Sequence, residues 1–219
     1  MSFDQRWEEV LASVRTEMDG RHKVREGALQ KCRLLIQTSS KCIRHIHRRQ
    51  FEQAEGLLDE ARELSMTARV EMEPFPTVRY ASYLQDAEKE MVEAAAVFAI
   101  VQDRALPSTE DLGVDIVSYL NGMGEAASEC RRYVLDEMRS GSLTEAARML
   151  SQMESVYDEL ITFDYPDSLT GGLRRTCDAL RAVIERTRSD LTMTQVQREL
   201  LEELREKEKG EKRKEKGEK

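Results

Sequence analysis

The sequence has few residues that interrupt helices, because only 4 of its 219 residues are proline and 11 are glycine. Aromatic residues account for only 5% of the chain, whereas charged residues account for 35%. Glu, Arg, Leu and Ala dominate the composition, and all four favour helix. The sequence therefore predicts an all-α protein that is helical almost throughout.

Several motifs of known chemistry are also missing. There is no phosphate-binding G-x-x-x-x-G-K-[ST] loop, no Ser/His/Asp pattern and no E-x-x-H spacing of the kind that ligates iron in ferritin-like proteins. These absences argue against P-loop enzymes, triad hydrolases and di-iron proteins. We accordingly interpret His22, His45 and His47 as surface residues.

The four cysteines show no C-x-x-C spacing, and no apolar signal sequence begins the chain. This pattern argues against a structural zinc site and favours a reducing, cytoplasmic setting. The longest apolar run is far shorter than the roughly 20 residues that span a bilayer, so we expect no membrane segment.

The length of 219 residues and the net charge of −8 fit one domain with a sizeable core. No apolar residue follows Leu204, and the segment beyond it is almost entirely Glu, Lys, Arg and Gly. Such a segment cannot bury enough apolar surface to offset the entropy of folding. We therefore expect a helical domain over residues 1–194 and a charged, frayed or disordered tail over 195–219.

Apolar periodicity and breaking residues predict where the helices lie. Asp19-Gly20 is expected to interrupt or bend the first helix, and Pro74-Phe75-Pro76 to end a later one. A central helix is expected from about Thr77 to Arg104. Gly122 and Gly124 are unfavourable inside a helix, so they indicate a close approach of another backbone. With the apolar seams of the first helices they offer more packing surface than one small bundle needs, which predicts a closed homo-oligomer.

Two pairs of glutamates stand out against this pattern. Ala94 to Val101 is apolar without a break and predicts central burial, yet Glu90 and Glu93 lie one turn apart at its start. Buried carboxylates need a cation, a proton or a basic partner. Glu125 and Glu129 form a second pair on one face of a later helix. Together the four predict an oxygen-rich metal site, and the alternative is ordinary salt bridging at helix surfaces.

A basic segment contrasts with the acidic balance of the whole chain. No acidic residue occurs between Glu26 and Glu52, a segment that contains several lysines and arginines. Such a face suits phosphate contacts that do not depend on base identity. The alternative is a solvated helix face or contacts with acidic residues of the Glu-rich third helix. Arg79, Tyr80 and Tyr83 add groups that suit stacking on single-stranded RNA, although a tyrosine at helical spacing more often belongs to the core. The predicted RNA-binding residues are Lys41, Arg44, Arg48, Arg49, Arg79, Tyr80 and Tyr83.

Four stretches carry a family pattern: R-E-G-A-L-Q-K-C-R-L-L-I-Q-T-S-S-K-C-I-R-H-I-H-R from Arg25, E-M-V-E-A-A-A-V-F from Glu90, V-S-Y-L-N-G-M-G-E-A-A-S-E from Val117, and S-L-T-G-G-L-R-R-T-C-D-A-L from Ser168. In this order they resemble the translin family, and within it the branch of translin-associated factor X (TRAX). The resemblance extends over nearly all of the part expected to fold.

This resemblance implies a single-domain antiparallel bundle of about six to seven helices. It also implies assembly into a hollow homo-oligomer, typically an octamer, that acts on RNA. In the TRAX branch, acidic residues on two helices form the metal-dependent ribonuclease centre, and Glu90, Glu93, Glu125 and Glu129 match those positions. The implied activity is that of an Mg²⁺- or Mn²⁺-dependent endoribonuclease acting on single-stranded or short RNA with little base specificity.

The chain also departs from the TRAX pattern. Position 125 is Glu where that pattern has Asp, the long insertion of eukaryotic TRAX is absent, and the charged tail has no counterpart. The compact chain resembles a prokaryotic, archaeal member of the family. Two alternatives remain. An all-α nucleoside triphosphate pyrophosphohydrolase uses E-x-x-E followed by E-x-x-D, but Ser128 stands in place of the final Asp. A non-catalytic RNA-binding or scaffolding oligomer is favoured if the glutamates pair with arginines.

Overall fold

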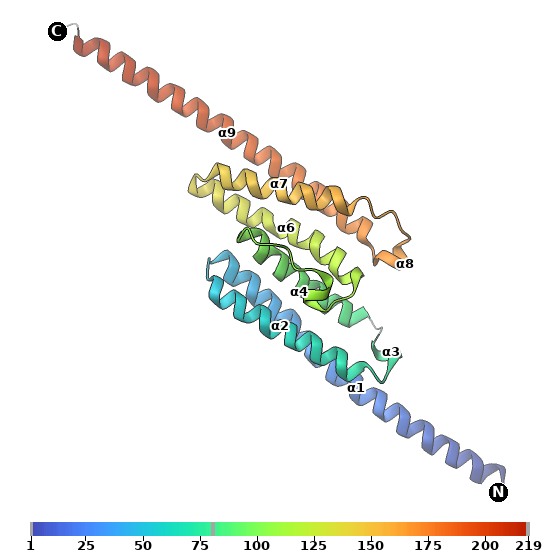
Figure 1. Ribbon diagram of the computed structural model, residues 1–219. Helices are drawn as coiled ribbons and strands as arrows, with labels where there is room; N and C mark the ends of the chain where they lie inside the picture. The colour runs from blue at the N-terminus through green and yellow to red at the C-terminus, as the bar shows by residue number, and fades with distance from the viewer. Residues whose placement is uncertain (1, 80–81, 218–219) are drawn as a thin grey trace.

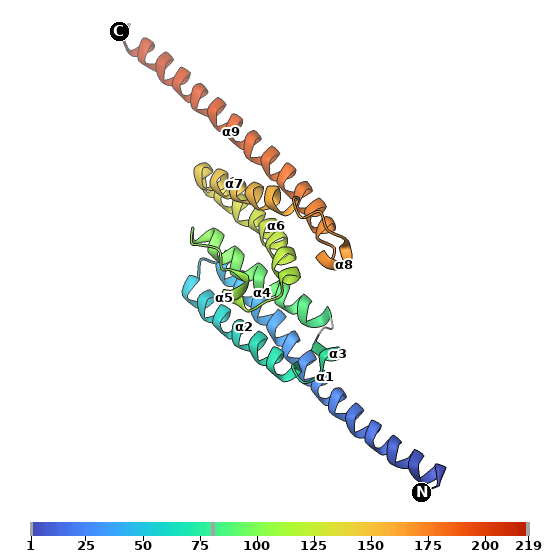
Figure 2. The same ribbon diagram turned by 45° about the vertical axis from the view of Figure 1, so that its right-hand side comes forward.

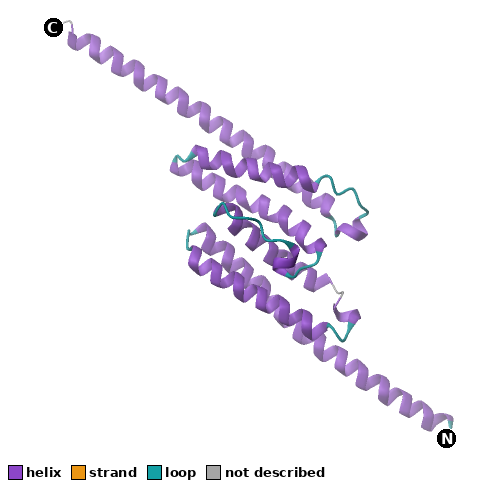
Figure 3. Cartoon of the chain, in the orientation of Figure 1, coloured by secondary structure: helices purple, strands orange, loops and turns teal. Residues whose placement is uncertain are grey.

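The computed structural model describes residues 2–79 and 82–217, with residues 211–217 as backbone only. The described chain forms helices and no strand, which confirms the all-α prediction (Figure 3). Six helices are long: α1 (Phe3–His47), α2 (Phe51–Met72), α4 (Ser82–Val101), α6 (Ile116–Ser140), α7 (Leu143–Leu160) and α9 (Leu173–Gly217). Three single-turn helices lie in the connections: α3 (Pro76–Arg79), α5 (Thr109–Leu112) and α8 (Asp167–Thr170).

The long helices lie side by side in a bundle whose centre is α4 and α6 (Figures 1 and 2). Helix α1 packs against α2 and α4, α4 packs against α6, and α6 packs against α7 and α9. The first part of α1 and the last part of α9 extend beyond the bundle in opposite directions (Figure 1). No helix in the described ranges is both long and apolar enough to cross a membrane.

Helix α4 supplies the centre of the core, as its apolar sequence predicts. Every residue from Ala94 to Val101 is buried, and the ring of Phe98 packs edge-on against Phe51 with 6.3 Å between ring centroids. Glu88 on the same helix is completely buried. Arg69 donates to both carboxylate oxygens of Glu88, at 2.5 and 2.6 Å, and Ser65 donates at 2.9 Å. This buried charge is therefore fully partnered.

Three predictions about helix boundaries need correction or comment. The expected break at Asp19-Gly20 is wrong, because α1 is one continuous helix. A single glycine costs a helix only about 1 kcal/mol, which is too little to end a long one. The expected central helix from Thr77 to Arg104 corresponds to α3 and α4, between which residues 80–81 lie outside the described residues, and α4 ends at Val101 rather than Arg104. Helix α9 continues to Gly217 without a break at residue 195, so the division of domain and tail stays a prediction.

Candidate metal centre

Two glycines determine how closely α6 approaches its neighbours. A Cβ atom on Gly122 would lie 2.6 Å from Val92 Cβ and 2.7 Å from the carbonyl oxygen of Lys89, both on α4. A Cβ atom on Gly124 would lie 2.5 Å from Thr176 Cγ2 on α9. The expected close approach is confirmed, but these glycines pack within the chain. They are therefore not available for contacts between copies, contrary to the prediction from sequence.

This contact brings glutamates of α4 and α6 together. Carboxylate oxygens of Glu90, Glu93 and Glu125 lie within 4.8 Å of one another, and all three residues are partly buried. Among the described residues, no donor lies within hydrogen-bond distance of Glu90 or Glu93. Partly buried carboxylates normally accept hydrogen bonds, so these two have unused ligand capacity. We call Glu90, Glu93 and Glu125 the carboxylate cluster.

Burial and mutual repulsion change the proton affinity of the cluster. Burial, and then the charges of Glu90, Glu125 and Glu129, raise the pKa of Glu93 from 4.5 to about 8, with Lys89 opposing. Burial also raises the pKa of Glu90, where Lys89 acts in the opposite direction. These groups therefore favour a proton or a cation in their vicinity.

The cluster has one basic partner. Lys89 Nζ donates to Glu125 Oε1 at 2.6 Å, and both side chains are partly exposed. Local ion pairing, the alternative reading from sequence, therefore accounts for one glutamate of the cluster. It leaves Glu90 and Glu93 without a hydrogen-bonded cation among the described residues.

Glu129 is not one of the three glutamates of the cluster, although its charge acts on Glu93. Its Oε1 atom is 2.7 Å from Nε2 of His47, whose side chain is only 4% exposed. The interpretation of His47 as a surface residue is therefore wrong, and sequence reasoning missed this partner of a predicted site residue. The Nδ1 atom of His47 is buried and has no hydrogen-bond partner among the described residues. The only signal in the sequence was its position four residues after Ile43, on the packed face of α1.

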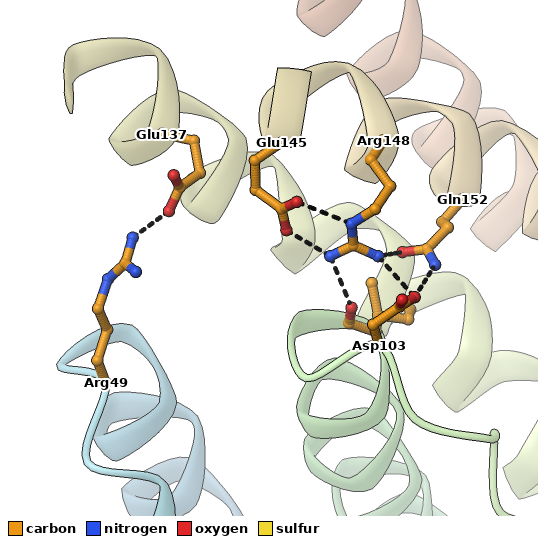
Figure 4. Close-up of polar contacts among 7 residues, drawn as sticks. Arg49, Asp103, Glu137, Glu145, Arg148 and Gln152 are labelled. Carbon is orange, nitrogen blue, oxygen red and sulfur yellow. Dashed lines mark hydrogen bonds and ion pairs between the residues drawn. The ribbon is translucent and has the colours of Figure 1, made fainter. Parts of the chain in front are cut away.

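The residues predicted to bind RNA fall into two groups. Lys41, Arg44 and Arg48 are exposed at the end of α1, and their side chains make no ion pair or hydrogen bond with any described residue. They remain available for phosphate groups. Arg49 instead pairs with the buried Glu137, as Figure 4 shows, and its guanidinium lies 5.3 Å from the ring centroid of Tyr133.

The remaining three have other environments. Arg79 pairs with Glu73. The hydroxyl of Tyr83 donates to the carbonyl oxygen of Val78 at 3.0 Å, and the ring packs against the core, which suits a structural role better than stacking on a base. Tyr80 lies outside the described residues.

The far end of α4 is fixed by a polar network. Arg148 on α7 donates to the carbonyl oxygen of Ile100 at 3.2 Å and to Asp103 at 3.1 Å (Figure 4). Glu145 and Gln152 hold the same guanidinium. Helix α4 is thus held by Gly122 packing near the cluster and by Arg148 at its other end, which fixes the positions of Glu90 and Glu93.

The donor set of the cluster suits one class of cation. It consists of carboxylate oxygens alone, with no thiol or imidazole within the group. Hard divalent cations such as Mg²⁺ and Mn²⁺ prefer oxygen ligands, whereas zinc is usually held by Cys and His. Glu90, Glu93 and Glu125 could therefore hold Mg²⁺ or Mn²⁺.

The sequence and the structure were compared with those of known proteins. No family model matches the chain. It is 30% identical to the uncharacterized protein MJ0175 of Methanocaldococcus jannaschii over 171 residues, which are 77% of this chain and 75% of that protein. Among solved structures, it is similar to AfC3PO in complex with duplex RNA, with 34% identity and a TM-score of 0.80 over 86% of this chain and 97% of that one.

Two further structures agree. AfC3PO alone matches with 34% identity and a TM-score of 0.80, over 86% of this chain and 98% of that one. Apo-NeC3PO shares the fold, with 24% identity and a TM-score of 0.76 over 84% of this chain and 96% of that one. The helix order, the tight contact between α4 and α6, and the identity to AfC3PO agree with one another, and they show that the chain belongs to the translin family, the family of the C3PO proteins.

Proposed function

We propose that this protein is a TRAX-like, divalent-metal-dependent endoribonuclease that acts on single-stranded or short RNA with little base specificity. The observation that carries the proposal is the carboxylate cluster, in which two of three converging glutamates have no hydrogen-bond donor among the described residues. A buried group of like charges is unfavourable unless a cation is bound. A metal-binding role therefore explains the convergence of these glutamates better than a contribution to the stability of the fold does.

Glu90, Glu93 and Glu125 would hold Mg²⁺ or Mn²⁺, and Glu129 would complete the set from the next turn of α6. A bound ion of this type supplies an activated water and stabilises charge on the scissile phosphate. His47 holds Glu129 in place through its Nε2 atom. Ligands that are only carboxylates make no contact specific to a base, which suits cleavage with little sequence preference.

RNA binding is supported by similarity and by charge. AfC3PO, which is 34% identical to this chain, has been solved with duplex RNA. Lys41, Arg44 and Arg48 have no partner in the described part of the chain and offer contacts to phosphates on an otherwise acidic protein. We also propose a reducing, cytoplasmic setting, which the four unpaired, buried cysteines support.

Self-association into a hollow homo-oligomer, an octamer in the family pattern, is part of the proposal. Large apolar side chains remain exposed on the extending ends of α1 and α9, among them Trp7, Val14, Leu200 and Leu204. Exposed apolar residues repeated along a helix typically mark contacts with another chain. These exposed side chains support the proposed assembly. Gly122 and Gly124 do not, because they pack within the chain.

The two alternatives have less support. Ser128, which replaces the final acid of the pyrophosphohydrolase motif, donates its hydroxyl to the Gly124 carbonyl of its own helix and supplies no ligand. Pairing of the glutamates with arginines would favour a non-catalytic RNA-binding or scaffolding role. None of the four glutamates has an arginine partner among the described residues, although Lys89 and His47 pair with two of them.

The test is RNA cleavage by purified protein with Mg²⁺ or Mn²⁺, using labelled single-stranded RNA and a panel of nucleotides. We expect Glu93→Gln and Glu129→Gln to abolish RNA cleavage but to leave RNA binding intact, because Gln keeps the volume and removes the charge that holds a hard cation. Glu63→Gln is the matched control, since Glu63 is exposed on α2 without a described partner. Wild-type rates in both site variants would show that these glutamates are structural, and nucleotide hydrolysis without RNA cleavage would favour the pyrophosphohydrolase.

A further inference from the structure

A second feature lies directly beside the carboxylate cluster. A cavity of about 380 Å³ opens between the start of α4, the start of α6 and the turn from α8 to α9. Glu125 and Lys89 are part of its lining, so the cavity and the cluster share residues. Its volume lies within the range of small-molecule sites and is sufficient for a nucleotide unit.

Two glycines and an asparagine fix the position of the α8–α9 turn that lines the cavity. Gly171 and Gly172 both have positive φ, 59° and 85°, and a Cβ atom on Gly171 would lie 2.5 Å from Val117 Cγ1 on α6. Asn121 on α6 donates to the carbonyl oxygen of Thr170 at 2.8 Å and accepts from Thr176 Oγ1 at 2.8 Å. The buried side chain of Asn121 therefore fastens the α8–α9 turn to α6 and fixes the start of α9.

This rigid turn presents one unpaired cation to the cavity. Arg175 lines the cavity, is exposed, and makes no ion pair or hydrogen bond with any described residue. The other cation of the lining, Lys89, is already bonded to Glu125. A guanidinium group matches the geometry of a phosphate better than any other side chain, since it donates two parallel hydrogen bonds.

We propose that Arg175 binds a backbone phosphate of RNA next to the scissile phosphate, so that one nucleotide lies in this cavity. The inference rests on the proposed function, because it takes the carboxylate cluster as the place of cleavage. It assigns a role to the Gly171-Gly172 turn, which the metal centre does not use. It also places a phosphate contact on α9, far along the chain from the basic segment of α1. Arg175 is thus a substrate-positioning residue.

The neighbouring arginine provides a matched control. Arg174 is also exposed and unpaired among the described residues, but it lines a different cavity, bounded by the loop between α7 and α8. Arg174→Ala and Arg175→Ala therefore remove the same charge from adjacent positions on one helix. Arg175→Lys keeps the charge and removes the paired donors.

The experiment measures the affinity of a fluorescent single-stranded oligoribonucleotide in EDTA over a range of salt concentrations, and then kcat and KM for its cleavage with Mg²⁺ or Mn²⁺. We expect Arg175→Ala to weaken binding by about 10-fold or more and to raise KM, as for the loss of a charged hydrogen bond. The slope of log affinity against log salt should decrease by about 0.7, the value for one phosphate contact with a single strand. Arg174→Ala should match the wild type, and Arg175→Lys should fall between.

The outcomes separate this inference from the proposed function. If the wild type cleaves RNA and the two alanine variants have equal affinities and salt slopes, the nuclease function stands and the Arg175 site is wrong. If the wild type does not cleave RNA but only Arg175→Ala weakens binding in EDTA, the site stands as an RNA contact and the nuclease function is wrong. A wild type that neither binds nor cleaves RNA refutes both.

Discussion

Gly122→Ala tests whether the contact between α4 and α6 builds the carboxylate cluster. The added Cβ atom would lie 2.6 Å from Val92 Cβ and 2.7 Å from the carbonyl oxygen of Lys89. Carbon atoms in contact are normally about 3.5 to 4.0 Å apart, so the helices must separate by about 1 Å. Glu90 and Glu93 directly follow the contact residues Lys89 and Val92 on α4, and Glu125 lies one turn beyond Gly122 on α6. Separation would therefore move Glu125 away from the other two.

The expected change in stability follows from two opposing terms. Replacing glycine by alanine inside a helix stabilises it by about 1 kcal/mol. Overpacking a well-packed contact costs about 1–3 kcal/mol, and the upper end applies here because the close atoms include a backbone oxygen that cannot rotate away. The net effect should be a destabilisation of about 2 kcal/mol. For a chain of this length that corresponds to a decrease in Tm of about 4–8 °C.

The assay is thermal unfolding of the metal-free protein at one protein concentration. Gly56→Ala is the control, because Gly56 is exposed in α2 and no described atom outside the adjoining backbone of α2 lies within 4 Å of its added Cβ. It should raise Tm by about 2–4 °C. The same substitution is therefore expected to raise Tm at position 56 and to lower it at position 122. Val92→Ala should not rescue Gly122→Ala, since Val92 Cβ and the Lys89 oxygen remain. A Gly122→Ala protein as stable as wild type, with unchanged Mg²⁺ binding, would refute this account of the site.

Three further predictions concern RNA, the tail and assembly. RNA binding should weaken steeply with increasing salt concentration, and charge reversal of Arg44 and Arg48 together should lower the affinity for every RNA sequence alike. Unchanged affinity of this double variant in a filter-binding or anisotropy assay would show that RNA binds at another surface of the protein. Removal of the segment after Leu204 should leave Tm and assembly unchanged, because residues 205–210 are exposed, and a large decrease in Tm would show that the segment is docked. Light scattering at physiological salt should give an oligomeric mass, and a monomeric mass would contradict the homo-oligomer.

The central features of the fold could be predicted because they depend on local sequence. An apolar run such as Ala94–Val101 is buried whichever helices surround it, and all of it is buried in the structure. Gly122 and Gly124 likewise indicated close contacts. Their partners on α4 and α9 could not be predicted, because such contacts join segments far apart in the sequence. The interruption expected at Gly20 was wrong because a small local cost was given too much weight against the continuity of a long helix.

The site was predicted less completely than the fold. Spacing along one helix placed Glu90 beside Glu93, but spacing cannot show that Glu125 joins them or that Glu129 contacts His47. Ion pairs such as Arg49 with Glu137 form between residues 88 positions apart. The basic segment therefore contains side chains that stabilise the fold through ion pairs and others that have no ion pair with any residue that the structure describes.

The carboxylate cluster also makes the stability of the metal-free protein depend on pH. Burial and the charges of Glu90, Glu125 and Glu129 raise the pKa of Glu93 to about 8, with only Lys89 opposing, whereas an ordinary glutamate has a value of 4.5. The unfolded chain therefore releases this proton at a lower pH than the folded protein does. The stabilisation is complete below about pH 4.5 and is lost as the pH rises through about 8, by at most about 1.4 kcal/mol per pH unit.

Thermal unfolding in EDTA from about pH 5 to about pH 8 tests this dependence. The Tm of the wild type should fall across this range relative to that of Glu93→Gln, whose neutral side chain has no proton to release. Glu63→Gln should follow the wild type. Added Mg²⁺ should stabilise the wild type most at the alkaline end, because metal ions bind carboxylates only when these are ionised. If wild type and Glu93→Gln show parallel curves in EDTA, Glu93 ionises at an ordinary pH in the folded protein, and the burial and repulsion that support the proposed metal site are absent.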